Sequence, residues 1–143
     1  MARVIRINHI GVATADIQHA LSVFSQGLGL PVAGSEHVPG DAVRVTFLPV
    51  GESRLELLEP VGEEGPVHKF LSNRGPGIHH ICFEVDDLPG MMERLRAAGV
   101  ELVDSEPRRG AHGTLVAFVH PKSANGVLVE LVQTADGERD KQE

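Results

Sequence analysis

Val127-Leu128-Val129-Glu130-Leu131-Val132 is the stretch from which both the fold and the candidate site follow. It is a short run of β-branched and leucine residues bounded by Asn125-Gly126 and by a polar tail, which is typical of a buried strand. Glu130 lies in the middle of this run, where an ionised carboxylate without a positive partner is strongly disfavoured. No Lys or Arg lies in the strand. Either the carboxyl group is protonated or a cation binds it, and a metal ion is the simplest cation to invoke.

The same pattern occurs earlier in the chain, where Glu56 interrupts the apolar run Leu55-Glu56-Leu57-Leu58. This match is one of several that indicate an internal duplication. The matched positions are His9 with His80, Asp16 with Asp87, Phe47 with Phe118, and Glu56 with Glu130. A duplicated unit usually buries its open face against its copy. We therefore predict an α+β fold of two tandem β-α-β-β-β modules, which form an open metal-binding β cup with helices outside.

Hydrophobic periodicity assigns the individual elements. Strands are predicted at residues 4–13, 43–50, 54–59, 78–85, 100–105, 114–119 and 127–133. Asp16 and Asp87 are each expected to cap a helix, because Asp is a favoured N-cap residue. The apolar stripe of the first helix is Ile17, Ala20, Leu21, Phe24 and Leu28, and that of the second is Leu88, Met91, Met92, Leu95 and Ala98.

The chain is long enough for one domain, and we predict a single domain over residues 1–143. Its two modules are expected at residues 4–60 and 77–133. Residues 61–76 are expected to link them through a short helix at 66–74, and residues 134–143 are expected to form a frayed polar tail.

Composition excludes several classes of partner. The net charge of −7 and the absence of Trp and Tyr argue against nucleic acid, which needs a basic patch or a stacking platform. No apolar run is long enough to span a membrane, and no signal segment opens the chain. We therefore expect a cytoplasmic protein, or one in an organelle lumen if a targeting segment has been removed. The single Cys82 excludes an internal disulfide.

Four residues of the duplication suit a metal site. The repeat predicts that His9, Glu56, His80 and Glu130 come together at the floor of the cup. Two imidazoles and two carboxylates suit a divalent first-row metal, whose charge the two carboxylates neutralise. Four protein ligands in an octahedral site leave positions for substrate, which favours a catalytic role. A lone histidine on a strand is more often a hydrogen-bonded core residue, and that is our expectation for His79.

The sequence resembles a known family, the vicinal-oxygen-chelate superfamily, and within that superfamily it resembles the methylmalonyl-CoA epimerases. The resemblance covers residues 7–133. The motifs that carry it are Asn8-His9-Ile10-Gly11, Phe47-Leu48-Pro49-Val50-Gly51, Leu55-Glu56-Leu57-Leu58-Glu59-Pro60, Lys69-Phe70-Leu71, Gly77-Ile78-His79-His80-Ile81, Gly110-Ala111-His112-Gly113, and His120-Pro121-Lys122-Ser123 followed by Gly126-Val127-Leu128-Val129-Glu130-Leu131.

The resemblance implies an isomerase that interconverts (2R)- and (2S)-methylmalonyl-CoA between propionyl-CoA and succinyl-CoA, and that forms a homodimer. It implies one divalent metal ion, Co²⁺ being the best activator and Zn²⁺, Mn²⁺, Ni²⁺ or Mg²⁺ being alternatives. The ligand role falls on His9, Glu56, His80 and Glu130. A catalytic Glu of the family aligns with Val45 here, which leaves the second base open.

Proton transfer at C2 passes through an enolate, whose charge a metal ion would stabilise. We take Glu130 as the first catalytic base and Glu56 as the second, a water or a hydroxyl being the alternative. Lys122, Ser123 and Arg109 are candidates for contacts with the CoA moiety, although solvated polar groups would look the same.

Three other functions are compatible with such a cup. A glyoxalase I-type lyase would share the metal ligands, but the motifs at residues 110–113 and 120–123 argue against it. An iron(II) dioxygenase needs only two histidines and one carboxylate. A metal-free drug-sequestering protein usually has aromatic walls, whereas the aromatic content here is 3%.

Overall fold

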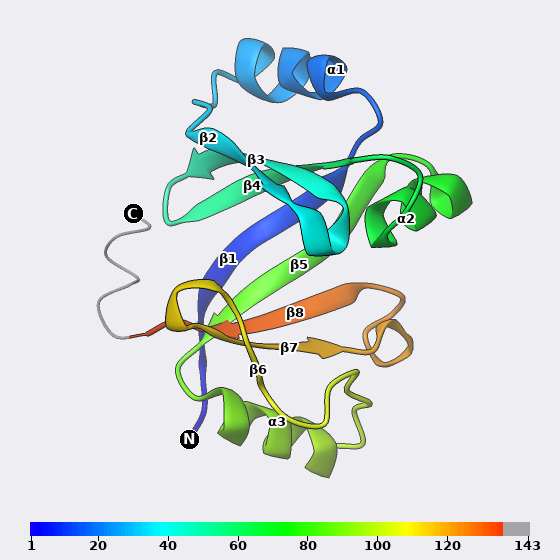
Figure 1. The fold of residues 1–143 in the computed structure, drawn as a ribbon. Helices are drawn as coiled ribbons and strands as arrows, with labels where there is room; N and C mark the ends of the chain where they lie inside the picture. Colours follow the sequence, from blue (N-terminus) through cyan, green and yellow to red (C-terminus); the bar gives the residue numbers. More distant parts are fainter. Residues whose placement is uncertain (136–143) are drawn as a thin grey trace. The chain divides into compact units, whose positions relative to one another are not determined.

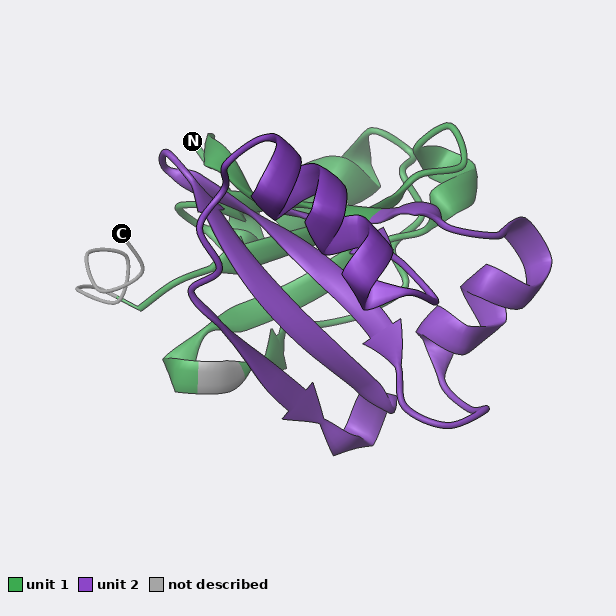
Figure 2. Ribbon diagram, turned by 90° about the horizontal axis from the view of Figure 1, so that it is seen from above, with its two compact units in different colours: residues 1–8, 80–143 green, residues 9–79 purple. Residues whose placement is uncertain are grey.

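The computed structural model describes residues 1–135, which contain eight strands and three α-helices in a mixed α+β arrangement (Figure 1). The predicted α+β class is confirmed. The chain divides into two compact units, one of residues 1–8 and 80–143 and the other of residues 9–79 (Figure 2). The first residues of the chain thus join the unit that holds the second repeat. Most of the predicted polar tail, from residue 136 on, lies outside the described residues.

Unit 2, residues 9–79, holds the first repeat. Its strands follow the order β2-β3-β4-β1, in which β1 and β4 are parallel and the other neighbours are antiparallel. Its elements are β1 (Val4–Ala13, from His9 on), α1 (Ile17–Leu21), the π-helix η1 (Ser22–Gly27), β2 (Gly34–Val38), the 3-10 helix η2 (Pro39–Asp41), β3 (Val43–Val50), β4 (Ser53–Pro60), α2 (Pro66–Arg74) and the start of β5 (Gly77–Val85).

The alternation of side chains along β3 and β4 gives this sheet two apolar faces. On one face, Leu48 and Leu57 are fully buried and pack with Ala20 of α1. On the other face, Val45 and Leu58 pack in a cluster that includes Val67 of α2. Glu56 lies on the Val45 face, because it is two residues from Leu58 and side chains alternate along a strand. The candidate ligand is thereby placed on the face opposite α1.

The first helix begins as predicted but changes its geometry after one turn. The side chain of Asp16 caps it by accepting a hydrogen bond from the His19 amide, at 3.1 Å. From Ser22 the chain continues as a π-helix, whose wider turn breaks the predicted 3.6-residue stripe. Phe24 still packs in the cluster, whereas Leu28 is 68% exposed, so its predicted burial is wrong.

Unit 1 holds the second repeat. Its strand order is β1-β5-β8-β7-β6, with β5 and β8 parallel and both β7·β8 and β6·β7 antiparallel. Its elements are the first half of β1, most of β5, α3 (Leu88–Ala97), β6 (Arg108–Arg109), the 3-10 helix η3 (Ala111–Gly113), β7 (Leu115–Val119), the 3-10 helix η4 (Pro121–Ser123) and β8 (Leu128–Gln133).

Helix α3 covers one face of this sheet and follows the predicted pattern except at Ala98, which is exposed and lies just beyond the end of the helix. Asp87 caps it by accepting from the Gly90 amide at 3.1 Å. Its buried side chains pack against the strands in one cluster. The members of that cluster include Val85, Leu88, Met91, Met92, Ala117, Val119 and Leu131. Phe118 and Glu130, which alternate with these strand residues, therefore lie on the opposite face.

Three strands differ from the prediction, one of them being the two-residue strand β6, which was not predicted. The strand predicted at residues 100–105 does not form, and only Leu102 makes an isolated bridge, with Val119. The reason lies at Asp104, whose carboxylate accepts the Phe118 amide at 2.8 Å and so replaces a backbone carbonyl in the ladder. Strand β2 was not predicted, because four of its five residues are exposed and it carries no apolar alternation. Among the described residues, no helix is long and apolar enough to cross a membrane.

Candidate metal centre

Unit 2 contributes one histidine–glutamate pair. His9 lies on β1 and Glu56 on β4, and the parallel register places Glu56 beside Gly11, two residues along the same face from His9. The Nδ1 atom of His9 lies 3.4 Å from Oε2 of Glu56, and both residues are buried, at 7% and 8% exposure. The predicted proximity of these two residues is therefore present within this unit.

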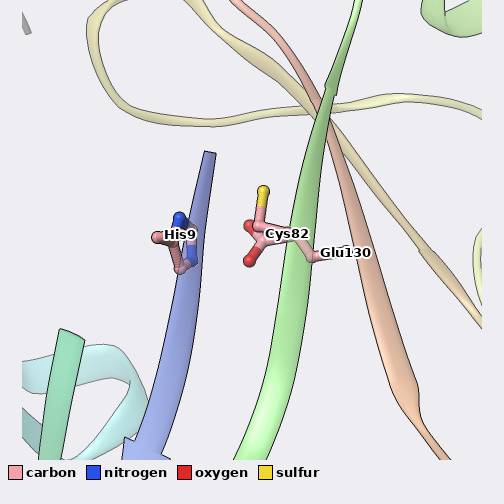
Figure 3. Close-up of side chains that lie close together, drawn as sticks. All are labelled: His9, Cys82 and Glu130. Atoms are coloured by element: carbon pink, nitrogen blue, oxygen red, sulfur yellow. The ribbon is translucent and has the colours of Figure 1, made fainter. Parts of the chain in front are cut away.

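Unit 1 contributes the matching pair. His80 lies on β5 and Glu130 on β8, and Nε2 of His80 is 3.4 Å from Oε1 of Glu130. Cys82 is in direct register with Glu130, so its thiol projects on the same face, and it is fully buried. Figure 3 shows Cys82 and Glu130 on β5 and β8, and it shows His9 on β1. Its register with Glu130 makes Cys82 a candidate ligand by position.

The donor atoms in each pair fit a divalent metal ion. A separation of 3.4 Å is longer than the usual 2.7–3.2 Å of an N–H···O hydrogen bond. Imidazole nitrogen and carboxylate oxygen are both ordinary ligands of such ions. The residues present therefore suit the metal that the sequence predicts.

Arg54 is part of the unit 2 site, although the sequence prediction did not include it. Its Nε donates to Oε2 of Glu56 at 2.7 Å, and its guanidinium lies 5.7 Å from the centre of the Phe47 ring. Phe47 is in direct register with Glu56 on the neighbouring strand. The signal was available, because Arg54 and Glu56 are two residues apart on one strand and must share a face.

A second buried polar group lies in unit 1, next to the His80–Glu130 pair in sequence. Glu84 is only 1% exposed and follows His80 and Cys82 on the same face of β5. The side-chain amide of Asn8 donates to its Oε1 at 3.2 Å, and Nε of Arg6 lies 3.9 Å from the same oxygen. This arrangement ties the first half of β1 to β5.

The three residues that were predicted to contact CoA lie in different parts of unit 1. Lys122 and Arg109 are exposed, and Arg109 is in register with Leu115, on the sheet face opposite to Glu130. The hydroxyl of Ser123 accepts the Glu101 amide at 2.9 Å, which holds the turn before β8. A role in CoA binding stays a prediction for all three residues.

Two further expectations concern residues of unit 2. His79 is half-buried and packs edge-on against Phe70, with ring centres 5.1 Å apart, in keeping with the structural role expected of it. Val45 is buried in an apolar cluster, so this position offers no group for proton transfer.

Comparisons with known proteins agree with these observations. A family model described as the Glyoxalase/Bleomycin resistance protein/Dioxygenase superfamily matches residues 8–118. The ethylmalonyl-CoA/methylmalonyl-CoA epimerase of Cereibacter sphaeroides is 42% identical over 130 residues, which cover 90% of this chain and 97% of that relative.

Solved structures agree as well. The methylmalonyl-CoA epimerase of Mycobacterium tuberculosis matches with a TM-score of 0.81 at 37% identity, covering 92% of this chain and 89% of that one. A methylmalonyl-CoA epimerase in complex with methylmalonyl-CoA and NH4+ matches with a TM-score of 0.80 at 36% identity, covering 93% of this chain and 96% of that one.

Proposed function

The chain belongs to the Glyoxalase/Bleomycin resistance protein/Dioxygenase superfamily, and we infer that within it the chain acts as a methylmalonyl-CoA epimerase. The enzyme interconverts the (2R) and (2S) forms of its substrate. The observation that carries this assignment is the repeated histidine–glutamate pair, with donor atoms 3.4 Å apart in each repeat, in a chain 42% identical to an epimerase of this substrate.

We propose that the two pairs bind one divalent metal ion together. The ligands are His9, Glu56, His80 and Glu130, and Cys82 is the buried neighbour of Glu130. Oxygen and nitrogen ligands of this kind suit Co²⁺, Zn²⁺, Mn²⁺ and Ni²⁺, and we favour Co²⁺ as the best activator. When bound, the ion would act as a Lewis acid that stabilises the negative charge developing on the thioester oxygen.

The protein's own residues supply the proton transfers. Inversion at C2 needs a group that removes the proton from one side of the carbon and a group that returns a proton on the other side. We assign removal to Glu130 and return to Glu56, because the duplication places one glutamate in each repeat. A water or a hydroxyl group is the alternative to Glu56. Val45 is apolar and cannot transfer a proton. Glu56 lies on the same face of the sheet, beside His9, and is therefore our choice for the second base.

The remaining features of the proposal concern the surroundings of the reaction. Lys122, Ser123 and Arg109 are proposed to contact the phosphates or the pantetheine of CoA. The enzyme is proposed to be a cytoplasmic homodimer that has no nucleic-acid or membrane partner. The net charge of −7 supports the exclusion of nucleic acid.

Incubation with methylmalonyl-CoA in D₂O tests the function. We expect the metal-loaded protein to place deuterium at C2, which proton NMR detects as loss of the C2 signal and of its coupling to the methyl group. The glutathione hemithioacetal of methylglyoxal should not be converted. Conversion of the hemithioacetal without exchange at C2 would instead identify a glyoxalase I-type lyase.

Glu130→Gln tests the first base. General bases contribute about 10²–10⁴-fold to the rate, so we expect deuterium exchange to fall by about that factor. Glu101→Gln is the matched control, because Glu101 is exposed in the same repeat and pairs with His120 at 3.5 Å. Exchange by Glu130→Gln at a rate close to wild type would show that Glu130 is not the base.

A further inference from the structure

Each repeat stacks an arginine on an equivalent phenylalanine. The guanidinium of Arg54 lies 5.7 Å from the Phe47 ring centre, and that of Arg108 lies 5.4 Å from the Phe118 ring centre. The two phenylalanines occupy matching positions in the duplication. Each is also in direct register with the glutamate of its repeat, Phe47 with Glu56 and Phe118 with Glu130. Each repeat thus has an arginine stacked on the phenylalanine that neighbours its candidate glutamate ligand.

The two arginines have different carboxylate partners. In unit 1, Nε of Arg108 lies 2.6 Å from Oδ1 of Asp104, whose other oxygen is fixed by the Phe118 amide. In unit 2, Nε of Arg54 donates instead to Glu56, at 2.7 Å. The position that matches Arg54 on β8 is two residues before Glu130, and it is occupied by the uncharged Leu128. The repeats have therefore diverged in how the glutamate is held.

We propose that Arg54 is a positioning residue, which fixes the carboxylate of Glu56 in the orientation that binds the metal ion. This inference rests on the proposed function, because it takes Glu56 as a ligand. Glu130 is not held by the equivalent arginine, since Arg108 is committed to Asp104. The two repeats thus differ, because Glu56 accepts from an arginine of its own strand, whereas the matching position on β8 is Leu128.

The local geometry explains why Arg54 supports the ligand and does not displace the metal. A carboxylate offers about four lone-pair sites on two oxygens, so a single N–H donor leaves sites for a metal ion. The ring of Phe47 and the carboxylate together restrict the guanidinium, whose side chain is 26% exposed. Groups that hydrogen-bond to a ligand orient it, and losing one typically weakens metal binding by about 10–100-fold.

Titration of the metal-stripped full chain with CoCl₂ tests this inference. Isothermal titration calorimetry gives the dissociation constant, and the visible absorption of bound Co²⁺ reports changes in its ligands. Arg54→Met keeps the length and the apolar stem over Phe47 but removes the donor. Arg44→Met is the matched control, because Arg44 is exposed on β3, next to Glu59.

We expect Arg54→Met to bind Co²⁺ about 10–100-fold more weakly, with a changed visible spectrum, and Arg44→Met to bind as the wild type does. Binding by Arg54→Met that equals or exceeds that of the wild type would overturn the inference alone. Failure of the wild type to bind Co²⁺ would overturn both the inference and the proposed metal site. If Arg54→Met does not fold, Arg54→Leu decides, because leucine occupies the matching position, Leu128, in the second repeat. A weaker affinity and an altered spectrum support the inference, and wild-type values refute it.

Discussion

Replacing Glu84 by glutamine should destabilise the protein strongly, although the two side chains have nearly the same shape. Glu84 is 1% exposed, and Nε of Arg6, whose side chain is 13% exposed, lies 3.9 Å from its Oε1. Glutamine can still accept the hydrogen bond that the Asn8 amide donates to this oxygen. The substitution therefore removes the negative charge that faces the half-buried guanidinium of Arg6.

The expected size follows from the distance. Two unit charges 3.9 Å apart attract by about 4 kcal/mol at an effective dielectric constant of about 20. Glutamine is less costly to bury than an ionised glutamate, which offsets part of this loss. Removing one partner of a buried ion pair typically costs about 3–5 kcal/mol, because the remaining charge is uncompensated. We expect the free energy of unfolding to fall by about 3 kcal/mol.

Urea denaturation followed by circular dichroism at 222 nm measures this change, since the chain has no Trp or Tyr for fluorescence. Glu93→Gln, on the exposed side of α3, is the matched control and should change stability by less than about 0.5 kcal/mol. The double variant Arg6→Met with Glu84→Met should lose less than Glu84→Gln, because both charges of this pair are removed together. A loss below about 1 kcal/mol for Glu84→Gln would refute this account of the ion pair.

Three other substitutions test the packing and the helix caps by the same denaturation assay. Leu57→Ala should cost about 2–5 kcal/mol, because Leu57 is fully buried in the cluster that α1 covers, and a cost below about 1 kcal/mol would contradict that packing. Leu28→Ala should change stability by less than about 0.5 kcal/mol, because Leu28 is 68% exposed after the π-helix. Asp87→Ala should cost about 1 kcal/mol through loss of the N-cap of α3, whereas an unchanged midpoint would show that this cap does not contribute.

The sequence predicted those features that depend on local periodicity. The apolar stripe after Asp87 identified α3, and alternation identified the strands whose one face is buried. Where an element has no buried face, the pattern is absent, and β2 was missed for that reason. The strand expected at residues 100–105 failed because the side chain of Asp104 takes a ladder hydrogen bond, which periodicity does not reveal.

The candidate site was predicted to a similar extent. Of the four residues predicted to come together, the structure shows His9 beside Glu56 and His80 beside Glu130, because matched positions in a repeat occupy matched places in the fold. It did not predict that Arg54 binds Glu56 while Arg108 binds Asp104. An arginine side chain is long enough to reach more than one carboxylate. Two repeats with the same strand pattern can therefore differ in which carboxylate the arginine binds.

The number of Co²⁺ ions bound per chain tests the central claim most directly. If both histidine–glutamate pairs share one ion, titration of the stripped protein should saturate at one Co²⁺ per chain, and either His9→Ala or His80→Ala should abolish tight binding. Saturation at two ions per chain, with each histidine variant losing only one of them, would show two separate sites and contradict the shared metal centre.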